Sequence, residues 1–381
     1  MNKLSVFAYP FRIFFLSMAV WAVAVVVLWV INITGLVHIQ FALPGMLWHQ
    51  HEILFAILNP AIAGFLLTAV CNWTGTERIH GTPLMLMWLV WLLARLAGIF
   101  PMAPEWLVIG LNLLFLPLVI LDAGHRILAK KQWRQAPILL VLTILWLAEG
   151  ALLLQLGIFS VQVALVAASA LMLIVGGRIT PAFSGGWLRG RGQDASFIYS
   201  PVWLERLTLG AMLTLCVVLT LGIASLSAFV ATVAGLISLA RILLWRGWRF
   251  WQEPLLWILH LSLLWIPVGL LLLAGGRMGW WAENVWVHAI GIGAMGALIF
   301  GVICRVSLGH TGRPMVLPAG MVSAFVMLHA AAVIRVLTAL QHVPWQRGIE
   351  ISAVLWCLAW LLFLVRYSAI LVQPRADGRP G

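Results

Sequence analysis

Long apolar runs separated by short polar segments fill the chain from end to end. Each run is about 20 residues long, which is the length that an α-helix needs to cross the hydrocarbon core of a membrane. This pattern predicts an all-α, polytopic membrane protein, because only helices or closed barrels satisfy the backbone in lipid. The twelve predicted spans cover residues 13–36, 47–71, 84–101, 105–124, 136–156, 159–177, 204–222, 225–245, 254–274, 283–305, 316–338 and 349–371.

The composition supports a membrane protein and excludes a water-soluble one. Hydrophobic residues make up 63% of the 381 positions and charged residues only 9%, and a soluble fold could not bury so much apolar surface. We therefore expect one transmembrane domain over residues 1–381, with the lipid bilayer as its surroundings. The net charge of +12 does not indicate nucleic acid, because the basic residues are spread thinly over loops.

The basic residues also predict the orientation. Most of the 23 Lys and Arg residues fall in segments that are cytoplasmic if both termini are inside, whereas the predicted outer loops hold only Arg277 and Arg347. This asymmetry favours twelve spans with both termini in the cytoplasm. The longest loop, residues 178–203, is then on the inner side.

Three ionisable side chains open the second predicted span, in Trp48-His49-Gln50-His51-Glu52. Ionisable groups inside a membrane segment are costly, so they are candidates for function, and imidazole is a common ligand of iron and copper. His49 and His51 are about 200° apart on a helix and should face different surroundings. Glu52 either accepts a hydrogen bond from a ligand imidazole or is an interfacial carboxylate.

An internal repeat relates this span to the tenth one. Residues 51–75 and 288–312 both follow the pattern His-x12-Gly-x9-Thr-Gly, and the spacing of related spans suggests three arcs of four helices with parallel internal repeats. The pseudo-repeats cover about residues 1–125, 136–245 and 254–371.

The repeat gives His51 and His288 matched depth, and two such imidazoles can ligate a haem iron axially. The alternative is that each ring only hydrogen-bonds a neighbouring helix. Arg95 and Arg335 are candidate partners of the haem propionates, because Arg binds carboxylates bidentately; the alternative is that they extend to the nearer interface.

Five other polar positions have less defined roles. His49 and His329 are candidate copper ligands, and His260 and His310 form a second candidate metal group on the inner side, with His310 in the predicted loop 307–312. Glu149 is ionisable, but the sequence reveals no relay around it.

Several motifs together resemble the NnrS family of bacterial membrane proteins over essentially the whole chain. They are Trp48-His49-x-His51-Glu52, the run from Ala63 to Gly75, Pro10-Phe11-Arg12, Gly176-Gly177-Arg178, Glu253-Pro254 followed by His260, His288 with Gly293, and Arg305 to Pro314. The resemblance implies an inner-membrane protein that binds haem b, with copper as an additional metal, and that responds to nitric oxide or iron-nitrosyl species. One departure is Cys71, where the family pattern has proline.

The helix pattern is also similar to the catalytic subunit of haem-copper oxidases and nitric oxide reductases, in which histidines of helices 2 and 10 hold a haem. His51 and His288 match those roles by helix number. The sixth predicted span has no histidine, and no span carries the copper-site cluster of the oxidases. A complete oxygen- or nitric-oxide-reducing centre is therefore not expected.

Two alternatives stay open at this point. A transporter of a small solute or metal complex also fits repeats with ionisable groups in the membrane. A nitric-oxide-reductase-like enzyme would need a quinol or another electron donor. The sequence does not decide whether the protein is an enzyme.

Overall fold

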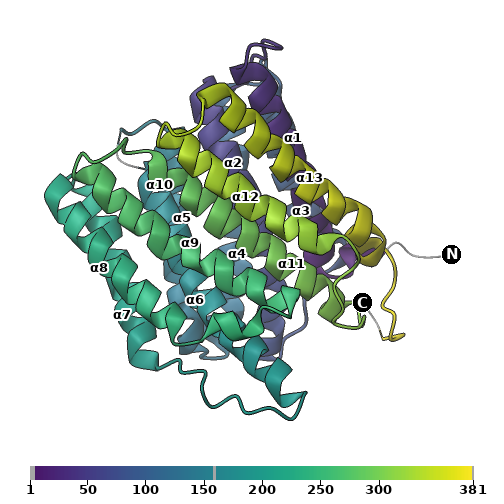
Figure 1. The fold of residues 1–381 in the computed structure, drawn as a ribbon. Helices are drawn as coiled ribbons and strands as arrows, with labels where there is room; N and C mark the ends of the chain where they lie inside the picture. The colour runs from purple at the N-terminus through teal and green to yellow at the C-terminus, as the bar shows by residue number, and fades with distance from the viewer. Residues whose placement is uncertain (1–4, 158–159, 380–381) are drawn as a thin grey trace. The chain divides into compact units, whose positions relative to one another are not determined.

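The described structure is helical and suited to a membrane. The computed structural model describes residues 5–157 and 160–379 (Figure 1). Within these residues, twelve helical segments are long and apolar enough to cross a membrane, and no strand is present. The prediction of an all-α, multi-pass membrane protein is confirmed.

The helices have the following bounds. They are α1 (Pro10–Ile33), α2 (Gly45–Thr74), α3 (Gly81–Ile99), α4 (Glu105–Ala129), α5 (Ala136–Leu153), α6 (Ser160–Arg189), α7 (Val202–Thr220), α8 (Ala224–Leu243), α9 (Pro254–Arg277), α10 (Val285–His288), α11 (Ala297–His310), α12 (Met321–Ala339) and α13 (Trp345–Val372). A π-helix, η4 (Ala289–Gly296), joins α10 to α11 in one span. Short 3-10 turns are η1 (Ser5–Phe7), η2 (Trp133–Gln135) and η3 (Gly247–Phe250).

The predicted inner loop 178–203 is partly wrong, because α6 continues to Arg189. The predicted loop is rich in glycine and arginine. Gly177 instead allows a close approach, since a Cβ there would lie 2.4 Å from a guanidinium nitrogen of Arg241 on α8. From the sequence alone, a glycine needed for close packing looks the same as a glycine needed for a turn.

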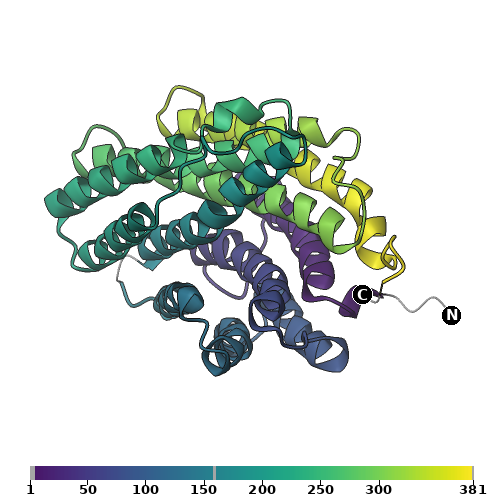
Figure 2. The same ribbon diagram turned by 90° about the horizontal axis from the view of Figure 1, so that it is seen from below.

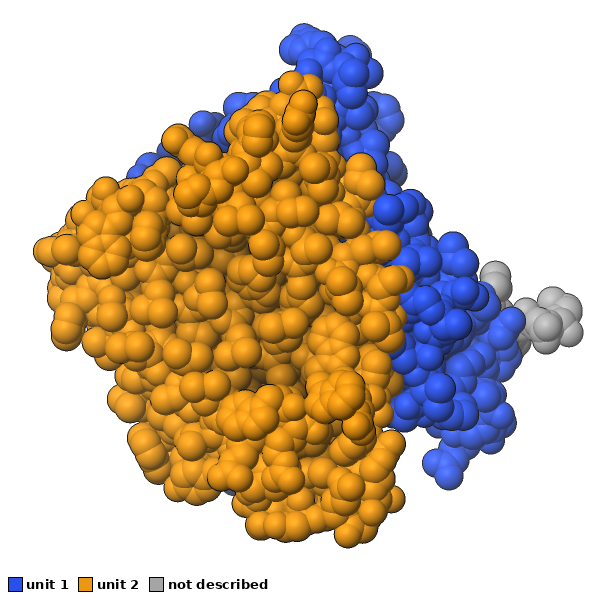
Figure 3. All heavy atoms as spheres, in the orientation of Figure 1, with its two compact units in different colours: residues 1–161, 303–321, 357–381 blue, residues 162–302, 322–356 orange. Residues whose placement is uncertain are grey.

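The chain divides into two compact units, coloured separately in Figure 3. Unit 1 comprises residues 1–161, 303–321 and 357–381, and unit 2 comprises residues 162–302 and 322–356. The single domain and the three arcs stay predictions.

In unit 1, α2 is the central helix and contacts α1, α3, α4 and α5 (Figure 2). Arg12, at the start of α1, is buried and binds the end of α13: its guanidinium donates to the carbonyls of Leu371 and Gln373, both at 2.7 Å. A cation on the last carbonyls of a helix satisfies acceptors that have no partner within the helix. In unit 2, α8 packs against α7 and α9, and α9 also contacts η3 and η4.

The two copies of the repeat end alike but differ in the middle. Gly75 and Gly312 both adopt left-handed backbone conformations, with φ of 63° and 68°. The preceding Thr74 and Thr311 each donate to the carbonyl four residues earlier. Between His288 and Gly301, however, eight residues are π-helical. A π-helix has more residues per turn than an α-helix. The angle about the helix axis between His288 and Gly301 therefore differs from the angle between His51 and Gly64.

Candidate functional site

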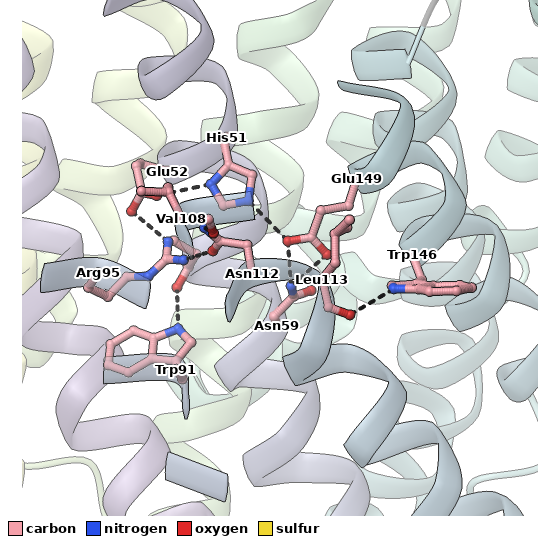
Figure 4. A network of polar contacts seen from close by, with 11 residues as sticks. His51, Glu52, Asn59, Trp91, Arg95, Val108, Asn112, Leu113, Trp146 and Glu149 are labelled. Carbon is pink, nitrogen blue, oxygen red and sulfur yellow. Dashed lines mark hydrogen bonds and ion pairs between the residues drawn. The ribbon is translucent and has the colours of Figure 1, made fainter. Parts of the chain in front are cut away.

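A group of buried polar side chains lies inside unit 1, where α2, α3, α4 and α5 meet (Figure 4). Each of these residues is at most 4% exposed. We call the group the His51 network. Its members are His51, Glu52, Asn59, Arg95, Asn112 and Glu149.

The imidazole of His51 lies between two carboxylates. Its Nδ1 is 2.9 Å from Oε1 of Glu52, and its Nε2 is 3.0 Å from Oε1 of Glu149 on α5. An ionised carboxylate only accepts hydrogen bonds. The ring is therefore an imidazolium, or one of the two carboxyls carries the proton.

Amide and guanidinium groups complete the network. Asn59 donates to both oxygens of Glu149, at 3.3 and 3.2 Å. Arg95 donates to Oε2 of Glu52 at 2.6 Å and also to the side-chain oxygen of Asn112. With His51 protonated, two cations face two carboxylates, so the group is neutral as a whole and avoids the cost of an unpaired buried charge.

Five of the six residues come together because they lie near the same end of their helices, whereas Asn59 lies at the middle of α2, about two turns beyond Glu52. His51 is six residues after the start of α2, about 9 Å along the axis, and Asn112 is near the start of α4. Arg95 and Glu149 are each four residues before the ends of α3 and α5. In the predicted orientation this is the outer end.

Two prolines help to fix the helices around the network. Pro60 in α2 has no N–H, so it leaves the carbonyl of Ala56 without its helical partner, and the indole of Trp91 donates to that carbonyl at 3.2 Å. Pro117 in α4 has the same effect on Leu113, whose carbonyl accepts from Trp146 at 2.9 Å (Figure 4). In each case the indole N–H of a tryptophan from a neighbouring helix supplies the hydrogen bond that the backbone carbonyl lacks.

The structure brings together three residues that the sequence singled out, His51, Glu52 and Arg95. His49 faces elsewhere, as the helical geometry requires: its ring stacks on Trp29 of α1 with centroids 4.0 Å apart. Sequence reasoning missed Asn59, Asn112 and the pairing of Glu149. A carboxylate inside the predicted span 136–156 was the available signal for Glu149.

The other predicted site residues lie outside the network. In unit 1, His310 is the last residue of α11 rather than part of a loop, and its ring lies 5.6 Å from that of Phe11. The helix continues through Ser307-Leu308-Gly309, so the predicted loop 307–312 is wrong over its first four residues.

Unit 2 contains the remaining four predicted residues. His260 lies within hydrogen-bond distance of the hydroxyl of Ser184, at 3.0 Å, and His329 accepts from the indole of Trp265 at 3.1 Å. His288 ends α10 where the π-helix begins, and Arg335 is half-buried on α12.

The His51 network fits a haem ligand in one respect. A metal-bound histidine usually donates its other ring N–H to a carboxylate, and Glu52 is in place to accept from Nδ1. The ligating atom would then be Nε2, where Glu149 now lies, so Glu149 has to move or change partner. Arg95 is already paired with Glu52 and Asn112. Over residues 5–157 and 160–379, no three His, Cys, Asp or Glu side chains are grouped to hold a metal ion, and copper stays a prediction.

Comparison with known proteins gives one family. The family model described as NnrS protein matches residues 5–375. No curated protein matches the chain closely enough to count as a relative.

Proposed function

This chain belongs to the NnrS family, and we propose that it is a haem b protein of the nitric oxide response, in which His51 and His288 would hold the haem. Family membership supports a membrane protein of the nitric oxide response in general, and the family is known to bind haem. When bound, haem iron would supply a site for nitric oxide once one of the two histidines is displaced.

The pairing of His51 with Glu52 is the observation that carries the proposal. The 2.9 Å contact to Nδ1 sets the orientation of the ring and directs Nε2 away from Glu52. Arg95 donates to Oε2 of Glu52 at 2.6 Å and holds this carboxyl group in place. A carboxylate that is fixed in this way makes the imidazole a stronger ligand.

Glu149 supplies the proton chemistry of the site. To act as a ligand, Nε2 must be without a proton, and the nearest acceptor is Oε1 of Glu149, at 3.0 Å. A proton that moves from Nε2 to Glu149 stays within the network, so its charge does not change. Asn59 is placed to keep the protonated carboxyl hydrogen-bonded.

Further parts of the proposal rest on donor chemistry alone. Copper is assigned to His49 and His329, because imidazole suits copper; the second metal group, His260 with His310, stays a prediction. Arg335 is assigned to a haem propionate. We also propose the bacterial inner membrane, with both termini in the cytoplasm, because basic residues are concentrated in the loops of one side.

Haem content tests the ligands directly. The protein is purified, reconstituted with haem and compared with His51→Ala, His288→Ala and the control His80→Ala, since His80 is exposed. We expect the wild type and the control to retain haem and the other two variants to lose it. Equal haem content in all four proteins would contradict the assignment of both ligands.

A second candidate is a proton-coupled transporter. It is favoured by the contact of both nitrogens of His51 with carboxylates, an arrangement that holds a mobile proton inside a membrane segment. The two candidates differ in a simple measurement. A transporter without haem acidifies or alkalises the lumen of proteoliposomes when its solute is added, and its purified form is colourless before and after haem addition.

A further inference from the structure

A second polar feature, unrelated to the His51 network, lies at a pocket within unit 2. The pocket has a volume of about 400 Å³, which is in the range of small-molecule sites. Its walls come from the end of α8, from η3 with the residues that follow it, and from the first turns of α9. Its lining includes Gly247, Trp248, Trp251, Trp257 and His260.

The rim of this pocket is apolar and exposed. Trp248 and Trp251 are 62% and 70% exposed, and Leu243 and Leu261 also present much of their surface. Because α8 and α9 are helices able to cross a membrane, these side chains are suited to the interface between lipid and water, where tryptophan concentrates. A ligand would therefore enter from the bilayer.

One imidazole supplies the polar contact inside the pocket. His260 is 4% exposed, its ring stacks on Phe250, and its Nε2 is 3.0 Å from the hydroxyl of Ser184. Its Nδ1 is buried without a hydrogen-bond partner in the described residues. Such an atom is costly unless a ligand satisfies it.

Two neighbours of His260 determine the surroundings of Nδ1. A Cβ at position 247 would lie 2.7 Å from Nδ1, so a residue larger than glycine would fill the space beside this atom. The hydroxyl of Ser184 can donate to Nε2 or accept from it. His260 can therefore present Nδ1 either as an acceptor or as a donor.

We propose that this pocket binds the head group of a membrane quinone or quinol. The flat ring packs against the indoles of the pocket, and Nδ1 of His260 meets one ring oxygen. It donates to the carbonyl of the quinone and accepts from the hydroxyl of the quinol. The isoprenoid tail passes the rim formed by Trp248 and Trp251 into the lipid.

Binding and photolabelling test the proposal on the full-length protein. Decylubiquinone is titrated by calorimetry into the wild type, His260→Ala, Gly247→Val and the control His342→Ala, which changes an exposed histidine. We expect about tenfold weaker binding in His260→Ala, little binding in Gly247→Val and no change in the control. Haem content, measured in parallel, stays unchanged, which separates this result from a failure of the proposed haem site.

An azido-quinone supplies a test that needs no variant. The label should map to residues 242–264 and should be displaced by decylubiquinone. Labelling elsewhere would overturn the proposal, as would equal affinity in all four proteins. A phospholipid that occupies the pocket and is not displaced by quinone would also overturn it.

Discussion

At the scale of single residues, the two carboxylates beside His51 have different tasks. Glu52 is held by Arg95 and fixes the ring, whereas Glu149 faces the nitrogen that would bind iron. Replacing Glu52 by Gln should weaken haem binding by about 10- to 100-fold, because the ligand loses its anionic acceptor. Titration of the purified protein with haem measures this change.

The matched control for that substitution is Glu105→Gln, in the exposed first turn of α4. It should bind haem like the wild type. A Glu52→Gln protein with wild-type affinity would show that the carboxylate has no part in holding the ligand.

Arg95 has a different role, in the stability of unit 1. Arg95→Met leaves the carboxylate of Glu52 buried without its cation, and we expect it to reduce the free energy of unfolding by about 3–5 kcal/mol. Adding Glu52→Gln should restore part of this loss. Denaturant titration in micelles measures both effects, with the exposed Arg206→Met as control. Equal stability of Arg95→Met and the control would mean that the ion pair stabilises nothing.

At the scale of helices, prolines and tryptophans act as pairs. Trp91→Phe removes the donor to the Ala56 carbonyl and should destabilise the protein by about 1–3 kcal/mol. In a Pro60→Ala background the new N–H can bond that carbonyl, so the same change should matter less. A double-mutant cycle of unfolding free energies measures the coupling. The pairing would be contradicted if the effects of Trp91→Phe and Pro60→Ala on the unfolding free energy were strictly additive. It would also be contradicted if the exposed Trp106→Phe destabilised the protein as much as Trp91→Phe.

The segment after α13 gives a pH-dependent contact outside the membrane spans. Hydrogen bonds from Arg375 lower the pKa of Asp377 to about 2, and Arg375 also donates to the carbonyl of His310. Since the pKa of this acid is depressed, its ion pair contributes fully above the ordinary carboxyl pKa of about 3.9. The contribution is lost as the pH falls through about 2.

A spin label on Gly378→Cys can follow this contact. We expect low mobility of the label from neutral pH down to about pH 4 and rising mobility towards pH 2. In an Asp377→Asn background the label should be mobile already at neutral pH. A mobility that does not change with pH in the first protein would contradict the pairing.

At the scale of the whole molecule, the orientation is open to a direct test. If both termini are cytoplasmic, a green fluorescent protein fused after Gly381 folds and fluoresces in intact bacteria, and alkaline phosphatase at the same point is inactive. The opposite pair of results would reverse the assignment of every loop, and the His51 network would then lie at the inner end of its helices.

The sequence predicted the spans well and the contacts between them poorly. Hydropathy shows where a helix must cross lipid, because the backbone has no other way to satisfy its polar groups there. The contact from His51 to Glu149 joins residues 98 positions apart, and it depends on the rotation of two helices about their axes. The π-helix after His288 changes such a rotation without any clear signal in the sequence. Glu52 and Arg95 were recognised as ionisable, but not as partners.

The optical spectrum of the purified, haem-reconstituted protein tests the central assignment most directly, with and without nitric oxide. We predict a Soret band in the wild type that shifts when nitric oxide is added, and the loss of this band in His51→Ala but not in His80→Ala. A wild-type protein that stays colourless after reconstitution, or a His51→Ala protein with the wild-type spectrum and shift, would contradict the account.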